Sequence, residues 1–585
     1  MPESSSAPLT KRVIYDRLHY LLQHLLVLIP TLPSTLQGHL MRHFPHKRLP
    51  LAAQVTYIRN TLRIAEYCPE LADRILATII DRVIQIDVSK STLRYSIQLP
   101  YHLQVEVQVE IEEIEDNLDC AGLEEVFELD PFDAVVGQEG VEKEVEVPED
   151  DQDGLSDLSS EAEDPDEPAN NPDEFTTDFH HIKDMVNKLD TILTLVFDYL
   201  DRPSVAVKPM LPTDSPPSGS PSSTPLSENE PPQSTMAFDP ELEKAARRSQ
   251  FHALLSIFDG AIIRTFKSRY TQFLIFWYSS LDPEFSDLFQ GMLVEKALLD
   301  ENLPMVTRIA ASSYISSFVS RATFVDKESA RNVVSVLCDF LTSRMDALDH
   351  TLRVGGELSG TYCGMFYAVC QAVFLIFCFR WRDLIEDQAE DVDELAELHA
   401  GRPVKKWLPR LYTLERAVSS LLNPLKVGRL ECPMLRDVSD GASQYCASNV
   451  VMQFARVAHA VDFIYCYPIL EANKRSSDGD ASQRTPAHQT FVPPQANTEL
   501  NTFFPFDPYK LPKSSRYIDE VYREWSAVTI DDDDDDEDED EDDYEDTDSA
   551  RVGVFIARTV PPDPLGDTLG VSFEAMSISP VRPQG

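Results

Sequence analysis

Few residues of this 585-residue chain have the types and the spacing that catalysis or metal binding requires. His180 and His181 are adjacent, but no cysteine and no second histidine pair stands at ligand spacing from them. The stretch GGELSG at residues 355–360 could cradle a phosphate, but a turn between two helices explains its glycines better. There is no H-E-x-x-H, G-x-S-x-G, Walker or G-x-G-x-x-G motif. We therefore expect a protein that is not an enzyme and that holds no cofactor or metal.

The nine cysteines form no C-x-x-C pair, and most stand in apolar runs, where cysteine behaves as a small hydrophobic residue. They indicate a reduced, intracellular protein. The N-terminal stretch MPESSSAPLTKR does not resemble a signal peptide. The longest apolar runs, LLVLIP and AVFLIFCF, are shorter than the 18 or so residues of a membrane span. We expect a soluble protein without a membrane partner.

The formal net charge of −48 is concentrated in two segments. Residues 106–174 hold 28 acidic residues and one lysine, and residues 531–548 hold 16 acidic residues and no basic one. The rest of the chain is left with a net charge of −5. Such acidic runs repel themselves and bury little apolar area, so we expect them to be disordered. Because phosphate-backbone binding needs clustered lysine and arginine, we expect no strong direct binding to DNA.

Small residues dominate the stretch RIAASSYISSFVSRATFV at residues 308–325. One interpretation is close packing of this helix on its neighbours, and we favour it. The other is a serine-bearing surface that a partner or a kinase recognises. The candidate residues are Ser312, Ser313, Ser316, Ser317 and Ser320.

Arg380, Trp381 and Arg382 end the apolar stretch CQAVFLIFCFRWRDL. Cations at the C-terminus of a helix complement its dipole. A tryptophan between two arginines is also a frequent composition at the centre of protein interfaces. A helix cap and a partner contact are equally good interpretations.

Several serines and threonines in polar segments match simple phosphorylation patterns. Some precede proline, and others have an acidic residue three positions later. Their clustering in segments that we expect to be exposed is typical of a regulatory switch. The candidates are Ser215, Ser220, Thr224, Thr485 and Ser579 before proline, and Ser160 and Thr529 before acidic residues.

The stretch FFPFDPYKLPKSSRYIDEVYREW, residues 503–525, is called the aromatic–proline segment below. Its three prolines exclude a regular helix through its first half. We expect residues 503–512 to be extended, with rings in grooves of the last helices, and Ser514 or Ser515 to cap a helix at 516–526. The first role that we expect of the segment is to cover the C-terminal end of the helical body. Contact with a partner is its second expected role. The structural candidates are Phe503, Phe504, Pro505, Phe506, Pro508, Tyr509, Tyr517, Tyr522 and Trp525.

The hydrophobic pattern of the segments that carry these residues has a helical period. In residues 69–88 apolar pairs recur every four residues, with charged residues between them. Helices of 12–25 residues at 35–50 residues per pair suggest an all-α, HEAT/armadillo-like helical-repeat superhelix. A globular multi-helix domain is the alternative, and a short strand ribbon over 102–111 is possible. Helices are expected at 11–29, 55–68, 69–88, 175–201, 241–268, 270–281, 283–299, 304–321, 328–349, 361–386, 407–421 and 446–470.

Composition changes divide the chain into segments. We expect a disordered N-terminus (1–10), N-terminal repeats (11–105), an acidic disordered loop (106–174), one helix of the repeat body (175–202), a Pro/Ser-rich linker (203–235), central and C-terminal repeats (236–470), a polar linker (471–498), the aromatic–proline segment with its terminal helix (499–528) and an acidic disordered tail (529–585).

Five blocks, in order, resemble the family of RNA polymerase I-specific transcription initiation factors. They are residues 57–88, 272–299, 308–325, 370–384 and 503–525, and an acidic loop in the N-terminal half also fits. The last block is the most distinctive, because its spacing of rings and prolines is hard to obtain by chance.

The resemblance implies a HEAT-repeat protein without catalysis. It implies a factor that binds RNA polymerase I near its stalk and recruits the enzyme to core-factor-bound ribosomal DNA promoters in the nucleus and nucleolus. It further implies control by regulatory kinases, a surface serine patch in polymerase binding, and self-association when no polymerase is bound. The alternative hypothesis is a HEAT-repeat nuclear transport or scaffold adaptor that is unrelated to transcription. A third hypothesis is an enzyme with an unfamiliar site.

Overall fold

The computed structural model describes residues 9–96, 132, 172–202, 240–265, 268–354, 360–386, 406–425, 446–469 and 504–525. Within these residues the chain is all-α, with isolated β-bridges and no strand. They form two compact units. Unit 1 takes the described residues within 1–96, 114–257 and 511–514, and unit 2 takes those within 258–510 and 515–585. The expected all-α class is confirmed.

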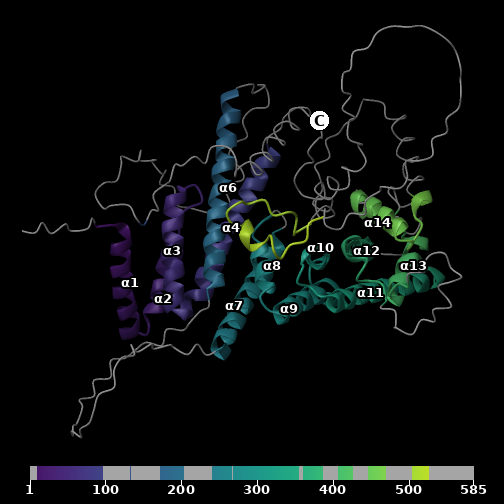
Figure 1. Ribbon diagram of the computed structural model, residues 1–585, viewed down its shortest axis with the longest axis horizontal. Coiled ribbons are helices and arrows are strands. Elements are labelled where there is room, and N and C mark those ends of the chain that lie inside the picture. The colour runs from purple at the N-terminus through teal and green to yellow at the C-terminus, as the bar shows by residue number, and fades with distance from the viewer. Residues whose placement is uncertain are drawn as a thin grey trace, which may run out of the picture. The chain divides into compact units, whose positions relative to one another are not determined.

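Unit 1 is built from consecutive helices that pack against one another (Figure 1). α3 packs on α4, and α6 packs on both of them. α1 contacts α2 and α3. The helices are α1 (Lys11–Leu28), α2 (Leu32–Arg42), α3 (Leu51–Tyr67), α4 (Pro69–Ser96), α6 (Pro172–Asp201) and the N-terminal part of α7 (Pro240–Gly260).

The apolar pairs predicted for residues 69–88 form the buried face of α4. Leu71, Ile75 and Ile79 are each at most 2% exposed. Pro69 opens the helix, where its missing N–H costs nothing because the first N–H groups have no helical partner. The helical period therefore predicted both the element and the side that faces the core.

α6 also buries one face, and it is a longer helix than the predicted stretch of α4. Ile182, Val186, Leu189 and Leu193 follow the three-to-four-residue spacing of one helix face, and all are buried. The helix begins at Pro172, slightly before the predicted start at residue 175. His180 and His181 lie within this helix, and their side chains are outside the described part of the structure.

A buried histidine joins α1 to α3. The Nδ1 of His19 lies 2.8 Å from the Tyr67 hydroxyl, and its Nε2 lies 3.0 Å from Oδ1 of Asn60. Asn60 offers only its oxygen there, since its Nδ2 donates to the Thr56 carbonyl. The neutral ring with hydrogen on Nε2 satisfies both contacts. Burial lowers the pKa of His19 below its ordinary value of 6.5.

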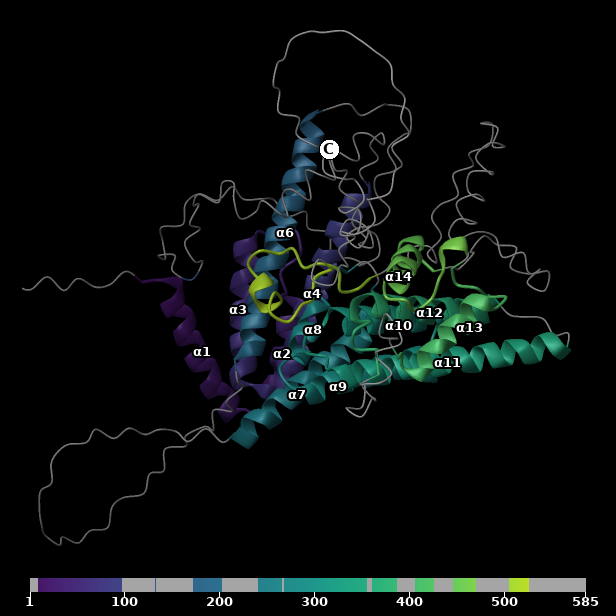
Figure 2. The same cartoon turned by 45° about the vertical axis from the view of Figure 1, so that its right-hand side comes forward.

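Unit 2 follows from residue 258 onward (Figures 1 and 2). Short helical turns supplement its longer helices. The elements are η1 (Ile262–Arg264), α8 (Phe273–Ser279), α9 (Pro283–Val294) with the π-helical turn Glu295–Leu299, α10 (Met305–Arg321), α11 (Lys327–Val354), α12 (Gly360–Arg380), η3 (Pro409–Tyr412), α13 (Thr413–Ser419) and α14 (Ser448–Ala460). Each predicted helix in this region is present, although several are shorter than expected.

α12 is the central helix of unit 2, and it contacts α10, α11 and α14. Its residues 363–380 are long and apolar enough to cross a membrane, and 94% of that window is buried inside the protein. Phe374 stacks on Phe454 of α14 at 4.0 Å between ring centroids. A helix that is apolar on every side is typical of the core of a multi-helix body.

The linkers and termini set out from the sequence lie mostly outside the described residues. The possible ribbon at 102–111 and the first five residues of GGELSG also lie outside them. Their predicted conformations remain predictions.

We predict a pH-dependent attachment of α1. Because the pKa of His19 is lower in the folded protein than in the unfolded chain, its contribution is fully present above pH 6.5 and is lost as the pH falls. Amide exchange of residues 11–28, corrected for the intrinsic effect of pH, should accelerate between pH 7.5 and 5.5. A His19→Gln variant should lack this dependence. Equal dependence in both proteins would contradict the assignment.

Candidate functional site

The aromatic–proline segment is docked on the helices of its own chain, and its described part begins at Phe504. Phe506 is 1% exposed. Its ring contacts Phe273 and Phe276 of α8 at centroid distances of 5.4 and 4.8 Å, and Tyr314 of α10 at 5.6 Å. Phe318 of α10 completes the cluster at 6.0 Å. Tilted and edge-on ring pairs at these distances add to the free energy of burial.

Polar groups fix the main chain on both sides of the Phe506 ring. Gln272 donates from Nε2 to the carbonyl of Pro505. The Tyr522 hydroxyl donates to the carbonyl of Phe506 at 3.0 Å. Burial raises the pKa of Tyr522, so this phenol remains a donor across the physiological range. Two carbonyls that would otherwise be buried without partners are satisfied in this way.

The end of the segment pairs with the residues that follow α10. Ala322 and Tyr522 form an antiparallel bridge. The Thr323 N–H donates to the Val521 carbonyl at 3.0 Å, and the Arg523 N–H donates to the Arg321 carbonyl at 2.6 Å. This short ladder holds the segment at the C-terminal end of α10.

Arg321 joins the segment to α12. Its guanidinium carbon lies 4.6 Å from the Phe379 ring centroid and 5.3 Å from that of Tyr522. Trp525 packs edge-on against Phe379 at 5.0 Å. A cation between two aromatic rings is favourable where water is excluded, and Arg321 is only 6% exposed.

Residues 511–514 of the segment belong to unit 1, where they bind α6 through Asp190. This carboxylate accepts the N–H of Lys513 at 2.9 Å and the N–H of Ser514 at 3.0 Å. It also accepts the Ser514 hydroxyl at 2.5 Å. Lys513 donates from Nζ to Asn187, one turn earlier on α6. Three donors on one buried carboxylate are the arrangement in which a buried charge is tolerated.

Three details predicted for the segment are wrong. No α-helix spans the described part of residues 516–526, where Ser515–Tyr517 form a single 3₁₀ turn. Ser514 does not cap a helix, because its hydroxyl is directed to Asp190. The rings of the first half pack on α8 and α10 rather than on the last helices, because the aromatic partners stand on α8 and α10. Phe503 is outside the described residues.

The serine-rich helix is α10, and the structure buries all five serines. Each is at most 8% exposed. The Ser312 hydroxyl donates to the Ala368 carbonyl of α12 at 3.3 Å, and that of Ser316 donates to the Ser313 carbonyl of its own helix at 2.9 Å. Small side chains let α10 and α12 approach closely, so the packing interpretation holds. The interpretation of Ser312, Ser313, Ser316, Ser317 and Ser320 as an exposed face is wrong for this structure.

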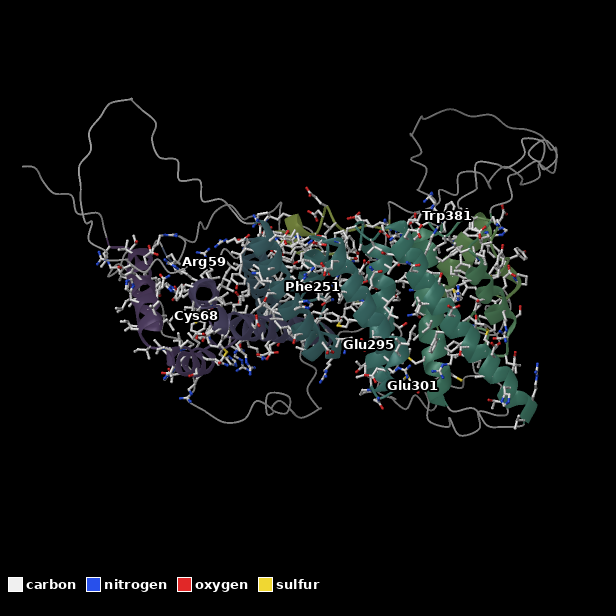
Figure 3. All side chains as sticks on the ribbon, turned by 90° about the horizontal axis from the view of Figure 1, so that it is seen from below. Arg59, Cys68, Phe251, Glu295, Glu301 and Trp381 are labelled. Atoms are coloured by element: carbon white, nitrogen blue, oxygen red, sulfur yellow. The ribbon has the colours of Figure 1, made fainter. Side chains whose placement is uncertain are left out.

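Arg380, Trp381 and Arg382 divide into a structural part and an exposed part. Arg380 is buried, donates to the Val319 and Val325 carbonyls and pairs with Asp383 at 2.7 Å. Arg382 is exposed, and its guanidinium carbon lies 4.5 Å from the Trp381 ring centroid. Trp381 lies at the outer edge of the ribbon in the view of Figure 3. The cap interpretation fits Arg380, and the other two residues remain candidates for partner contact.

The seven phosphorylation candidates all lie outside the described residues: Ser160, Ser215, Ser220, Thr224, Thr485, Thr529 and Ser579. Within the described part of the chain, no three histidine, cysteine or acidic side chains come together as a metal site. Seven cysteines there are unpaired as disulfides and buried. Burial raises the pKa of the Cys466 thiol to about 11, which disfavours nucleophilic thiolate. What the described residues assemble is therefore a set of docking contacts.

Sequence reasoning missed several residues on which the docking depends. Asp190 lies in α6 and Gln272 is the residue before α8, and both are buried. One signal in the sequence could have identified Asp190. It is a charged residue directly after the buried Leu189, at a position that the helical period places on the buried side.

Comparisons with known proteins agree on one family. The model of the family described as "RNA polymerase I specific transcription initiation factor RRN3" matches residues 1–432 and 443–530. The Schizosaccharomyces pombe "RNA polymerase I-specific transcription initiation factor rrn3" is 30% identical over 517 residues, which cover 88% of this chain and 67% of that protein. The Mus musculus RRN3 protein is 25% identical and covers 88% and 61%, and the Saccharomyces cerevisiae one is 25% identical and covers 87% and 71%. The chain thus spans about two thirds of the length of these relatives.

A solved structure shares the fold. The "Crystal Structure of RNA Polymerase I Transcription Initiation Factor Rrn3" aligns with a TM-score of 0.54 and 20% identity, over 87% of this chain and 74% of the other. This likeness supports the helical-repeat architecture.

Phe506→Ala should destabilise unit 2 by about 3–5 kcal/mol, because it removes the ring at the centre of the aromatic cluster. Thermal unfolding followed by circular dichroism measures the change. Tyr412→Ala is the control, since that ring is 45% exposed and should cost little. Similar losses of stability in the two variants would show that the Phe506 ring contributes no more to the folding of unit 2 than an exposed ring does.

The buried serines give a second prediction. Ser316→Asp with Ser317→Asp should lower stability by about 3 kcal/mol or more, because two carboxylates enter positions that are at most 3% exposed. Ser343→Asp on the exposed side of α11 should be nearly neutral. A doubly substituted protein that melts like the wild type would restore the exposed-surface interpretation.

Proposed function

The chain belongs to the RRN3 family of RNA polymerase I-specific transcription initiation factors, and from this membership we propose that it binds RNA polymerase I and recruits it to core-factor-bound ribosomal DNA promoters. The observation that carries the proposal is the family match, which extends over nearly all of residues 1–530. An initiation factor of this polymerase has a nuclear role. We propose the nucleolus as its site of action.

The composition supports an action through proteins rather than through direct DNA contact. The net charge is −48, so the chain as a whole repels a phosphate backbone. Promoter recruitment then depends on a protein already bound to ribosomal DNA. The family consists of initiation factors and is not a class of enzymes, and we propose that this member has no catalytic activity of its own.

For polymerase contact we propose the exposed end of α12. Arg382 is exposed and lies against the Trp381 ring, so the pair offers a cation and an apolar face together. Tryptophan and arginine are the residues most enriched at the energetic centres of interfaces. Stalk-proximal subunits of the polymerase are the proposed partners.

Regulation is proposed to act through the segments that contain Ser160, Ser215, Ser220, Thr224, Thr485, Thr529 and Ser579. Each phosphate adds about −1.5 to −2 charges and would increase repulsion from acidic partners. Self-association in the absence of polymerase is a further proposal carried over from the family resemblance.

Affinity purification at low salt should recover RNA polymerase I subunits with the tagged protein. Arg382→Glu should reduce this recovery about tenfold, because it reverses the exposed charge and removes the cation over Trp381. Arg353→Glu is the matched control, an exposed arginine at the end of α11. Both variants should keep the wild-type circular dichroism.

Recovery of nuclear-pore or phosphatase subunits in place of polymerase would favour the scaffold alternative. Equal recovery of polymerase subunits with Arg382→Glu and Arg353→Glu would agree with the proposed function but would show that the polymerase does not bind at the end of α12.

A further inference from the structure

Helix α1 of unit 1 has two apolar faces, of which one packs inward. Tyr15, His19, Leu22 and Leu26 recur every three to four residues, and all of them are buried or half-buried. His19 is hydrogen-bonded to α3, and the Tyr15 ring packs on that of Phe132 at 5.2 Å between centroids. This inner face is therefore covered by the protein itself.

The second face is a row of apolar residues spaced four, three, four and three positions apart. On a helix of about 3.6 residues per turn the row covers an arc of about 80°, centred about 110° from the inner face. Its four leucines are between 37% and 75% exposed. α1 lies at the edge of unit 1 in Figures 1 and 2. We call this row the leucine stripe, and it consists of Ile14, Leu18, Leu21, Leu25 and Leu28.

The spacing of the leucine stripe is that of positions a and d in a heptad repeat, the seam along which two helices pack side by side. Single exposed leucines are ordinary on a protein surface, whereas a continuous exposed row marks an interaction site. A heptad seam fits a helix better than an extended strand, because the holes between its side chains recur at helical spacing. The stripe therefore predicts a helical partner.

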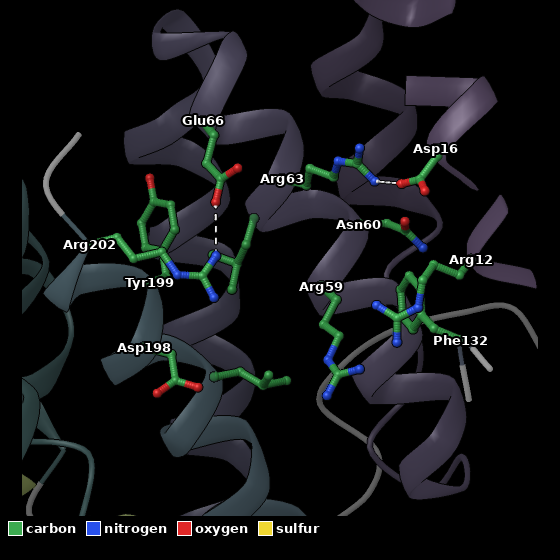
Figure 4. Close-up of a pocket in the computed structure, with 12 residues that line it drawn as sticks. Arg12, Asp16, Arg59, Asn60, Arg63, Glu66, Phe132, Asp198, Tyr199 and Arg202 are labelled. Atoms are coloured by element: carbon green, nitrogen blue, oxygen red, sulfur yellow. Dashed lines mark hydrogen bonds and ion pairs between the residues drawn. The ribbon is translucent and has the colours of Figure 1, made fainter. Parts of the chain in front are cut away.

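One edge of the leucine stripe is basic. Arg17 and His24 stand one heptad apart, at position g beside the row, and both are exposed. Arg17 has no ion-pair partner within the described part of the chain, and His24 contacts Tyr20 of the same helix. Asp16, the one carboxylate of α1, lies on the other side of the helix, where it pairs with Arg63 of α3 at 2.5 Å (Figure 4).

The sequence around α1 has the same sign of charge. Residues 17–65 hold six lysines and arginines and no aspartate or glutamate, within a chain whose net charge is −48. A partner helix with carboxylates along one edge complements this surface. A second copy of α1 does not, since an antiparallel pair brings Arg17 of one copy beside His24 of the other and supplies no carboxylate.

We propose that the leucine stripe docks an acidic amphipathic helix of a partner protein. The partner helix has apolar residues at its own a and d positions and aspartate or glutamate along the edge that faces Arg17 and His24. About four helical turns, roughly 21 Å, match the length from Ile14 to Leu28. This site belongs to unit 1 and is separate from the polymerase contact proposed at the end of α12.

Peptide binding to the full chain tests the proposal. The probe is a fluorescein-labelled peptide of three heptads with isoleucine at a, leucine at d and glutamate at e and g. The readout is fluorescence anisotropy at about 150 mM salt, where charges more than about 8 Å apart are largely screened. A comparison peptide has glutamine in place of every glutamate, and it should bind about tenfold more weakly. Equal affinity of the two peptides would overturn the proposal.

Leucine substitutions locate the site. Leu21→Ser should weaken binding of the acidic peptide about tenfold, because it removes the apolar side chain at the centre of the stripe. Leu242→Ser on α7 is the matched control, since the two leucines are 56% and 53% exposed. Both variants should keep the wild-type circular dichroism. Equal affinities of the two variants would overturn the proposal.

A charge reversal tests the basic edge. Arg17→Glu should weaken the acidic peptide about tenfold and leave the glutamine peptide nearly unchanged, because it places like charges at the edge of the docked helix. Arg74→Glu, on the exposed side of α4, should change neither affinity. An acidic peptide that binds Arg17→Glu as tightly as the wild type would contradict the assigned partner chemistry.

Two other occupants of the stripe have readouts of their own. Sedimentation that shows a dimer of the wild type and a monomer of Leu21→Ser would assign the stripe to a second copy of the chain. Flotation of the wild type, but not of Leu21→Ser, with phosphatidylcholine–phosphatidylserine vesicles would assign it to a lipid surface. Either result would overturn the proposal.

Amide exchange places the bound peptide without reference to affinity. Saturating acidic peptide should slow the exchange of residues 14–28, because a docked helix suppresses the opening of α1. The exchange of α7 should stay as it is in the free protein. Binding of the peptide with no slowing in α1 would place it elsewhere on the chain and overturn the proposal.

Discussion

The burial of one ring, Phe506, is the interaction on which the closure of unit 2 depends. Four aromatic residues of α8 and α10 surround it, and the whole residue is 1% exposed. The neighbouring carbonyls must then find protein donors, which Gln272 and Tyr522 supply. The position of Tyr522 in turn places Arg523 in line for the ladder at the end of α10.

Arginines that serve main-chain carbonyls are the second structural theme of unit 2. Arg308 donates to the carbonyls of Ala297 and Leu298 where the π-helical turn ends, and Arg331 donates to those of Asp383 and Ile385 after α12. The last carbonyls of a helix have no partner within it, and a guanidinium offers several donors in fixed directions. Arg308 thus replaces a regular cap at the end of the π-helical turn. Arg331 instead fixes the chain that follows α12.

What the sequence could predict was local. The period of residues 69–88 predicts a helix and its buried face, because a helix repeats its environment every three to four residues. The residue that an aromatic ring or a carboxylate contacts can lie far away along the chain. Phe506 meets α8, Asp190 meets Ser514 and Phe132 meets Arg59 across long stretches of chain, and no pattern near these residues encodes the meeting. The serines of α10 show the same limit, since small residues suit either a surface or a close helix contact until the neighbouring helix is known.

The late position of Phe506 has a consequence for synthesis of the chain. The hydrogen bond from Gln272 to Pro505 spans 233 residues. At about 5–20 residues per second, the ribosome needs roughly 12–47 seconds after Gln272 to synthesise Pro505. During that interval the rings of α8 have helices beside them but lack the ring that finally covers them. A nascent chain stalled or cleaved before residue 506 exposes this apolar face, and it becomes a substrate for chaperones or for degradation.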